Sequence, residues 1–186
     1  LVEILMDATI NHSKPFPLKR LHGWHAAIFP TGYSGIQKIR VAQWRKGKEA
    51  MRVISGRMGQ EKIHYEAPPA NQVAQEVQNF LTWYKNPPSN LDGLIRAGIV
   101  HFWFVTIHPY DDGNGRISRA LTDMAIAQDE KSERRLYSLS AQIVKERKDY
   151  YNILESSQKG SCDITRWLKW FLEMYVRAIG TSKSII

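Results

Sequence analysis

Cysteine, long apolar runs and export signals are scarce or missing in this sequence. The single cysteine, Cys162, cannot form a disulfide within the chain and has no second thiolate beside which to bind a metal ion. Nowhere in the 186 residues does an uncharged apolar run reach about 18 residues, the length that a membrane-spanning helix needs. The N-terminal residues also lack the basic, apolar and small-residue order of a signal peptide. We therefore expect a cytoplasmic protein that does not enter a membrane.

Acidic residues are few in the first third of the chain. Residues 1–66 contain 11 lysines and arginines against 5 acidic residues, whereas residues 67–186 contain 15 against 13. The basic residues of the first third gather at Arg45, Lys46, Lys48, Arg52 and Arg57, without regularly interleaved aromatic residues. Such a cluster is more typical of a solvated or anion-facing loop surface than of nucleic-acid binding. A non-catalytic, basic nucleic-acid-binding module remains the alternative from another functional class.

Apolar residues recur at helical spacing over much of the chain, which predicts a mostly α fold. Helices are predicted over residues 18–29, 71–84, 94–107, 117–127, 141–157 and 163–179. The helix over 94–107 is apolar almost all round, so we expect other helices to surround it. Two strand-like runs flank the sequence GRMGQ and predict a β-hairpin over 51–66, as the only β element.

The stretch HPYDDGNGR, residues 108–116, joins the apolar helix to the next amphipathic one. Gly113 and Gly115 permit backbone conformations in which successive N–H groups point into one concavity, and the following helix adds its own unpaired N–H groups. Together these groups predict an anion site. Arg116 and Arg119 fall near the start of that helix, where a bound polyphosphate would offset the unfavourable helix dipole.

Two further residues give this anion site a chemistry. Asp112 directly precedes Gly113 and could hold Mg²⁺, which prefers one or two carboxylates together with substrate phosphate oxygens. His108 follows the apolar helix and could act as a general base, because an imidazole near its ordinary pKa accepts a proton at neutral pH. A base, a metal carboxylate and an anion site with two arginines describe phosphoryl or nucleotidyl transfer. Asp111 is expected to be solvated.

The same residues also admit an ordinary structural interpretation. Asp-Gly and Asn-Gly are common turn sequences, and Arg119 could pair with Asp123 on the helix surface. Three histidines outside the motif are predicted to be structural. His101 lies in the apolar HFWF run, while His22 and His25 have no third ligand at metal-site spacing.

These residues resemble the motif of the Fic family, H-x-F-x-[D/E]-G-N-G-R-x-x-R. The sequence from His108 to Arg119 matches it at every fixed position except Tyr110, where the family has phenylalanine. Because that residue packs inward, its hydroxyl needs a hydrogen-bond partner. The likeness also covers the hairpin, the helix after it and the tail that begins YYNILESSQKG, which together make up most of the chain.

The resemblance implies a Fic-like helical bundle with a short β-hairpin flap over residues 51–66. Residues 94–128 would form the helix, motif loop and helix of the core. The whole chain, 1–186, would be a single catalytic domain. Within it, residues 1–11 would be the remnant of an upstream helical region.

The activity that the resemblance implies is transfer of AMP from ATP to a Tyr, Thr or Ser hydroxyl of a target protein, with release of pyrophosphate. His108 would deprotonate that hydroxyl, and Asp112 would hold Mg²⁺. The phosphates of ATP would be bound by Gly113, Asn114, Gly115, Arg116 and Arg119. The flap would dock the target through Ile63, His64, Tyr65 and Glu66, while Tyr150 and Gln158 match positions around the adenine and ribose.

Regulation and related activities follow from the same resemblance. Many Fic proteins carry an inhibitory helix, [S/T]-x-x-x-E-[G/N], whose glutamate pairs with the second motif arginine, here Arg119. No match occurs in these residues, so we expect such a helix upstream in cis or supplied in trans. Transfer of phosphate or of another nucleotide moiety, and removal of AMP, stay open as alternatives. Self-modification and homo-oligomer formation also stay open.

Overall fold

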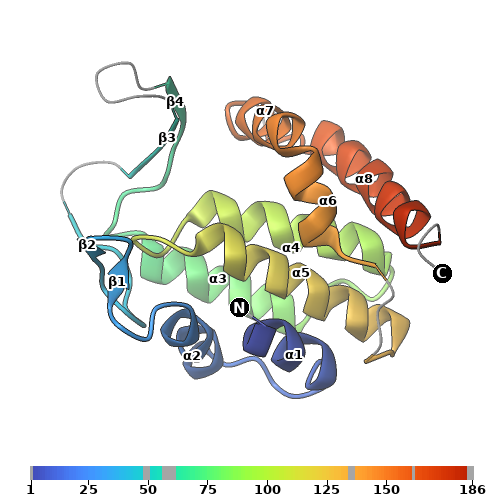
Figure 1. Cartoon of the computed structure of the whole chain (residues 1–186), viewed down its shortest axis with the longest axis horizontal. Helices are drawn as coiled ribbons and strands as arrows, with labels where there is room; N and C mark the ends of the chain where they lie inside the picture. The colour runs from blue at the N-terminus through green and yellow to red at the C-terminus, as the bar shows by residue number, and fades with distance from the viewer. Residues whose placement is uncertain (1, 48–50, 56–61, 134–136, 161, 184–186) are drawn as a thin grey trace. The chain divides into compact units, whose positions relative to one another are not determined.

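The computed structural model describes residues 2–47, 51–55, 62–133, 137–160 and 162–183. The chain divides into two compact units (Figure 1). The first comprises Leu1–Met51 and Ala67–Glu133, and the second comprises Arg52–Glu66 and Arg134–Ile186. Both units are mainly helical, and a small β-hairpin belongs to the second, so the predicted fold class is confirmed.

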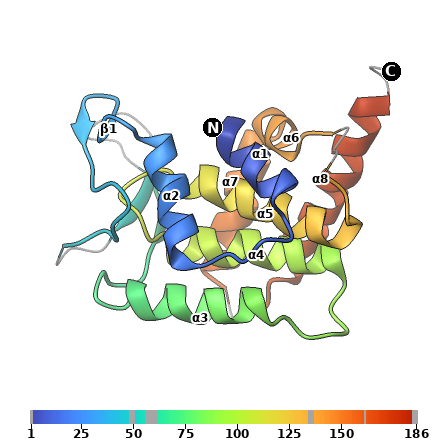
Figure 2. The same ribbon diagram turned by 90° about the horizontal axis from the view of Figure 1, so that it is seen from below.

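The first unit is a layered set of helices around α4. Its elements are α1 (Val2–Ile10), α2 (Leu18–Ile28), β1 (Tyr33–Ser34), β2 (Gln37–Lys38), α3 (Val73–Lys85), α4 (Gly93–Ile107) and α5 (Asn114–Glu130). Figure 2 shows α4 between α3 and α5, with α1 on the other side of α5. The almost wholly apolar sequence of α4 therefore matches its surroundings, as predicted.

Helix α4 begins and ends at residues with identifiable roles. Asp92 caps its first turn by accepting hydrogen bonds from the backbone N–H groups of Leu94 and Ile95, at 2.9 and 3.0 Å. Its buried side chains include Val100, Phe104 and Ile107; Phe104 packs against Phe80 of α3, while α4 as a whole also packs on α5, whose facing side is buried. The end of α4 and the start of α5 are thereby fixed close together in the core.

A second β element contradicts one prediction. β1 and β2 form an antiparallel ribbon in which Tyr33 pairs with Lys38 and Ser34 with Gln37. Gly35 makes the reversal at a φ of 57°, in the left-handed region that favours glycine. The prediction that 51–66 holds the only β element was wrong, because strands of two residues are too short to show an alternating pattern.

The second unit contains the predicted hairpin and three helices. These elements are β3 (Arg52–Ser55), β4 (Lys62–Glu66), α6 (Leu139–Lys145), α7 (Arg147–Gln158) and α8 (Thr165–Lys183). β3 and β4 are antiparallel, and Val53 pairs with Tyr65 while Ile54 pairs with Ile63. His64 is thus the extra residue of a β-bulge. The glycine-bearing turn predicted between the strands lies outside the described residues.

The helix predicted over 141–157 is divided in two. α6 ends and α7 begins at Glu146, whose φ of −102° and ψ of 26° depart from helical values. The carboxylate of Glu146 accepts two hydrogen bonds from Arg177 of α8, at 2.6 and 2.7 Å. Periodicity could not reveal this break, because the residue that binds Glu146 belongs to another helix. Among the described residues, no helix is long and apolar enough to cross a membrane.

His101 is a fully buried histidine in the core of the first unit. Its Nδ1 lies 2.9 Å from Thr122 Oγ1, and that hydroxyl donates to Ser118 O at 2.7 Å. Because the hydroxyl proton is used on Ser118, Thr122 accepts from His101 Nδ1–H. Burial lowers the pKa of His101 to about 3, and the charge of Arg119 acts in the same direction. His101 is therefore a neutral core histidine, as predicted.

Replacement of Thr122 by valine tests this buried contact. Thr122→Val keeps the shape of the side chain but removes the acceptor of His101 Nδ1–H, so the free energy of unfolding should fall by about 1–3 kcal/mol in urea titrations. Thr82→Val is the control on the exposed face of α3, where a change within about 0.5 kcal/mol is expected. Equal losses from the two variants would contradict a buried hydrogen bond of this kind.

Candidate active site

His108 ends α4 in an unusual backbone conformation. Its φ of 50° and ψ of 58° lie in the left-handed region, which few residues other than glycine adopt. The imidazole Nδ1 lies 3.2 Å from the carbonyl oxygen of Val105. Because a carbonyl only accepts, Nδ1 carries the proton and Nε2 keeps its lone pair. The geometry thus gives a neutral imidazole whose Nε2 can accept a proton.

The environment of His108 makes it a weaker base than the sequence suggests. Burial lowers the pKa of His108 to about 4, and the charge of Arg45 lowers it further, while the contact with Val105 and the charge of Asp112 oppose the shift. The expectation of an imidazole near its ordinary pKa was wrong. The sequence placed this histidine after a buried helix but did not show the surroundings of its ring, which is half-buried and has Arg45 nearby.

Arg45 holds the end of α4 in place. Its Nε donates to His108 O at 2.7 Å, and its Nη2 donates to Pro68 O at 2.5 Å and Ile107 O at 3.4 Å. Its backbone N–H donates to Pro109 O at 2.9 Å. Arg45 is only 4% exposed, so its assignment to a basic loop surface was wrong. It supplies donors to carbonyls that the end of a helix leaves unpaired.

Tyr110 packs inward and finds a partner for its hydroxyl. The side chain is fully buried, and its Oη lies 3.0 Å from His22 Nδ1. Its ring stacks on His25 at 4.0 Å between centroids. His25 Nδ1 accepts from the N–H of Ala42 at 3.1 Å, which leaves Nε2–H to donate to Asp112 O at 3.2 Å. Both histidines therefore support the motif loop, in agreement with their predicted structural role.

Asn114 closes the loop on itself. Its Oδ1 accepts from Tyr110 N and its Nδ2 donates to Tyr110 O, both at 2.9 Å. The side chain is 2% exposed, and both its oxygen and its nitrogen are bonded to the backbone of Tyr110. The backbone N–H of Asn114, at the first position of α5, has no acceptor within the helix and could therefore donate to an anion at the helix N-terminus. Its amide side chain shapes the site instead.

Two arginine side chains, Arg116 and Arg119, lie at the start of α5 beside the motif loop. Gly113 precedes the helix at a φ of 84°, and a Cβ there would meet Phe29 Cε2 at 2.8 Å. The guanidinium of Arg116 lies 4.6 Å from the centre of the Phe29 ring. Arg119 Nη1 lies 3.5 Å from where a Cβ of Gly115 would stand, so this side chain extends back toward the first turn. The glycines and arginines of the predicted anion site are thus brought together.

Asp112 is an ionised carboxylate beside the predicted anion site. Its Oδ2 accepts from Ser34 Oγ at 2.5 Å and from Arg116 Nη2 at 3.2 Å, and its Oδ1 accepts from Gly113 N at 2.5 Å. Burial acts to raise the pKa of Asp112, but these hydrogen bonds and the charge of Arg116 outweigh it and hold the pKa below its ordinary value. Ser34 comes from the β1–β2 ribbon, a contributor that sequence patterns did not reveal.

The donor set fits a metal ion shared with a substrate. Within the described part of the chain, no group of three or more His, Cys, Asp or Glu side chains could hold a metal. Mg²⁺ is commonly held by one or two carboxylates, with phosphate oxygens and water completing its shell. A single ionised Asp112 next to the N-terminus of α5 is compatible with that arrangement.

Asp111 differs from its expected solvated state. Its Oδ2 accepts from the backbone N–H of Arg40 at 2.9 Å, and the Arg40 guanidinium lies 3.5 Å from both carboxylate oxygens. Its side chain is 21% exposed. The contact ties the loop to the segment after β2, which is remote in sequence and so could not be foreseen.

The flap residues belong to the second unit. Ile63 is 46% exposed, and Tyr65 is half-buried. Glu66 is exposed and pairs with Arg52 across the hairpin. The bulged His64 points its Nδ1 at Glu155 Oε2 of α7, at 2.6 Å. This contact anchors β4 on α7.

Tyr150 and Gln158 lie on α7 in the same unit. Tyr150 is 4% exposed, and its ring packs against Trp170 of α8 at 5.9 Å between centroids. Gln158 is the last residue of α7 and is half-buried. Their assignment to the adenine and ribose stays a prediction.

Comparison with known proteins adds the following. Residues 15–126 match the model of the Fic/DOC family. A probable protein adenylyltransferase of Aquifex aeolicus is 25% identical over 97 residues, which are 52% of this chain and 28% of that protein. The fold is similar to a Fic family protein of Desulfovibrio desulfuricans G20, with a TM-score of 0.75 and 20% identity over 97% of this chain and 51% of the other.

A Fic domain containing signaling protein from Bacteroides thetaiotaomicron has a similar fold as well. Its TM-score is 0.69 at 16% identity, over 98% of this chain and 69% of the other. The chain spans little more than a quarter of the Aquifex relative and about half of the Desulfovibrio protein.

Two glycine substitutions test the loop geometry. Gly113→Ala should lower the free energy of unfolding by about 1–3 kcal/mol, because its positive φ strains a side chain and its Cβ would overlap Phe29. Gly115 lies in the first turn of α5, and a Cβ there would come no closer than 3.5 Å to another side chain. Gly115→Ala should therefore leave the free energy of unfolding unchanged or raise it by up to about 1 kcal/mol. Urea titration of both variants measures the difference. Effects of the same size and sign would show that the loop is not built this way.

Proposed function

Since this chain belongs to the Fic/DOC family, we propose that it transfers AMP from ATP to a hydroxyl side chain of a target protein and releases pyrophosphate. The observation that carries the proposal is the meeting of three groups at the start of α5. These are the open Nε2 of His108, the ionised Asp112 and the backbone N–H groups beside Arg116. The Aquifex relative, named a probable protein adenylyltransferase, supports AMP as the transferred group.

The proposed reaction is a single displacement at the α-phosphorus. His108 Nε2 accepts the proton of the target hydroxyl as its oxygen attacks the α-phosphorus of ATP. The bond from that phosphorus to the bridging oxygen breaks, and pyrophosphate leaves with the electron pair. The first N–H groups of α5, with Arg116 and Arg119, bind the phosphates and stabilise the charge that develops on them. Mg²⁺ held by Asp112 would supply further neutralisation of the phosphate charge.

The low pKa of His108 suits a base that works beside ATP. In the free protein, burial and the charge of Arg45 disfavour the imidazolium. The negative charges of bound ATP would favour that imidazolium and so raise the basicity of Nε2 when the nucleotide is present. His108 would therefore accept a proton more readily once ATP is bound.

The target and the regulator involve residues of the flap and of α5. We propose that the target segment docks along β4, near Ile63 and Tyr65, by strand addition. An inhibitory helix, in cis or in trans, would act by pairing a glutamate with Arg119. Because the reaction uses ATP and a protein acceptor, we place it in the cytoplasm.

The nucleic-acid alternative loses support from the side chains that motivated it. Arg45 is buried and bonded to carbonyl oxygens, and Arg52 pairs with Glu66. The guanidinium of Arg45 is therefore closed to a phosphate backbone, whereas that of Arg52, in an exposed ion pair, is not.

Labelled ATP distinguishes the proposed reaction from its relatives. With Mg²⁺ and a cell lysate, label from the α-phosphate of ATP should appear on protein, whereas label from the γ-phosphate should not. His108→Ala should reduce incorporation by about 100-fold or more, because no other base is placed at the attacking oxygen. His12→Ala, which removes a histidine remote from the motif in sequence, is the control and should label normally. Incorporation from the γ-phosphate would instead indicate phosphate transfer, and equal labelling by His108→Ala would refute the role of His108.

The pH profile provides a separate test. The base must be neutral in the protein that ATP meets, so kcat/KM for ATP should stay level as pH falls from 7.5 to about 5 and decline only as pH approaches the His108 pKa of about 4. Initial rates at saturating Mg²⁺ with a purified target would measure this, once acid unfolding has been excluded by circular dichroism at each pH. A decline centred near the ordinary histidine pKa of about 6.5 would contradict the buried environment of His108.

A further inference from the structure

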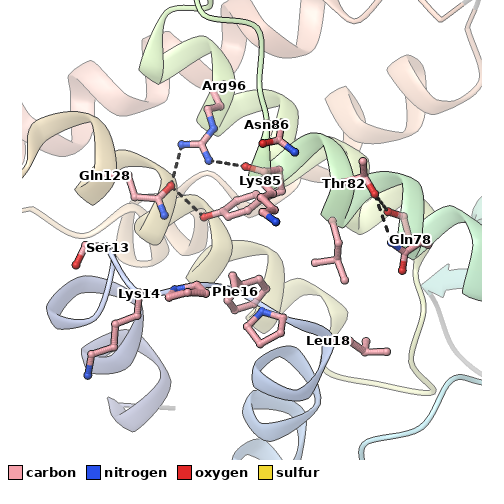
Figure 3. Close-up of a pocket in the computed structure, with 14 residues that line it drawn as sticks. Ser13, Lys14, Phe16, Leu18, Gln78, Thr82, Lys85, Asn86, Arg96 and Gln128 are labelled. Atoms are coloured by element: carbon pink, nitrogen blue, oxygen red, sulfur yellow. Dashed lines mark hydrogen bonds between the residues drawn. The ribbon is translucent and has the colours of Figure 1, made fainter.

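A cavity of about 750 Å³ lies in the first unit, outside the motif loop (Figure 3). It is bounded by the connection between α1 and α2, residues 13–18, and by the second half of α3, with one residue each from α4 and α5. Its volume falls in the range of sites that bind small molecules, roughly 300–1,000 Å³. None of the motif residues lines it.

The cavity is also distant from the proposed active site. Gln128, which lines it, lies about 20 Å along the axis of α5 from Asn114, at a rise of about 1.5 Å per residue. Gln128 is occupied structurally, since its Nε2 donates to His12 O at 2.7 Å and its Oε1 accepts from Arg96 at 2.8 Å. The two ends of α5 thus belong to two separate sites.

Arg96 brings a positive charge to one end of the cavity without an anion to neutralise it. Its Nη1 donates to Gln128 Oε1 and its Nη2 to Tyr84 O at 3.0 Å, and both acceptors are neutral. Its guanidinium lies 4.8 Å from the centre of the Tyr84 ring. Asp92, one helical turn earlier, is used to cap α4. A half-buried guanidinium still has N–H groups to offer after two bonds.

Two lysines add to this positive charge, and no acidic residue lines the cavity. Lys14 and Lys85 are exposed at its border, and no ion pair is formed by either within the described part of the chain. Figure 3 shows Lys14 and Arg96 toward the end that contains Gln128, with Lys85 nearer the middle, while Leu18 lies at the opposite end together with Gln78 and Thr82. The remaining wall mixes apolar side chains, among them Phe16 and Leu81, with neutral polar ones. The cavity is therefore positively charged toward Gln128, and its other lining is uncharged, with apolar surface at Phe16, Leu18 and Leu81.

We propose that this cavity binds a small organic acid with an aromatic or aliphatic body. Its carboxylate would lie at the end with Arg96, Lys14 and Lys85, where it would accept charge-assisted hydrogen bonds. Its apolar body would lie against Phe16 and Leu81, where its apolar surface would be removed from contact with water. The limited volume, between four parts of the chain, favours a small molecule over an extended peptide.

A matched pair of ligands tests the proposal. Isothermal titration with 2-naphthoate should give saturable binding to the whole chain with a dissociation constant below about 1 mM. The uncharged isostere 2-naphthamide should bind about tenfold more weakly or not at all, because it lacks the anion. Binding of 2-naphthoate should persist in the presence of ATP and in Arg116→Gln, since the site is distinct from the motif loop.

Three lysine variants locate the site without disturbing the bonds of Arg96. Lys14→Gln and Lys85→Gln should each weaken 2-naphthoate binding by about threefold or more, and the double variant by more than either. Lys19→Gln is the matched control, because Lys19 is exposed on α2 and does not line the cavity. Binding should be unchanged there.

Several outcomes would overturn the proposal. Equal affinity for naphthoate and naphthamide would remove the role of charge, and equal binding by all three lysine variants would place the ligand elsewhere. Loss of binding on addition of ATP would assign it to the motif loop. Binding of a glutamate-rich decapeptide with no binding of naphthoate would make the cavity a site for a protein partner. None of these readouts depends on AMP transfer, so the two proposals can fail separately.

Discussion

Arginine side chains complete the C-terminal ends of three helices in the first unit, and the arrangement of that unit depends on them. The last carbonyls of an α-helix have no partner within the helix. Arg20 donates to Asp7 O and Asn11 O at the end of α1, and Arg96 donates to Tyr84 O at the end of α3. Arg45 does the same for Ile107 O and His108 O of α4. In each case the guanidinium comes from a different segment, so one contact both satisfies a helix end and fixes two segments together.

At α4 this device has a chemical consequence. Arg45 holds the carbonyl of His108 and so helps to keep a non-glycine residue in the left-handed region, from which Nδ1 meets Val105 O. The same guanidinium places a positive charge near the imidazole and adds to the effect of burial on its pKa. In the free protein, the guanidinium that helps to position His108 therefore also lowers the basicity of its imidazole. A negatively charged substrate would counteract this loss of basicity, because its charge stabilises the imidazolium.

Local patterns predicted the features that depend on neighbouring residues. The periodicity of 94–107 and the glycines of the motif loop gave the helices and the loop between them, because their causes are short-range. Arg45 and Ser34 could not be predicted in the same way. Both lie in a segment without periodic pattern, and both contact the motif loop from more than 60 residues away in sequence. The break at Glu146 escaped prediction for a similar reason, since its partner is on α8.

The distribution of charge is explained by the same contacts. The excess of basic residues in the first third suggests a polyanion as partner, yet Arg20 is held by Asp7, Arg40 by Asp111 and Arg45 by carbonyl oxygens. These three guanidinium groups already donate to acceptors within the protein. Positive side chains also gather at two separate places: Arg116 and Arg119 at the start of α5, and Lys14, Lys85 and Arg96 around the cavity. Compact anions, of the size of a nucleotide or an organic acid, match such separated clusters better than an extended polymer does.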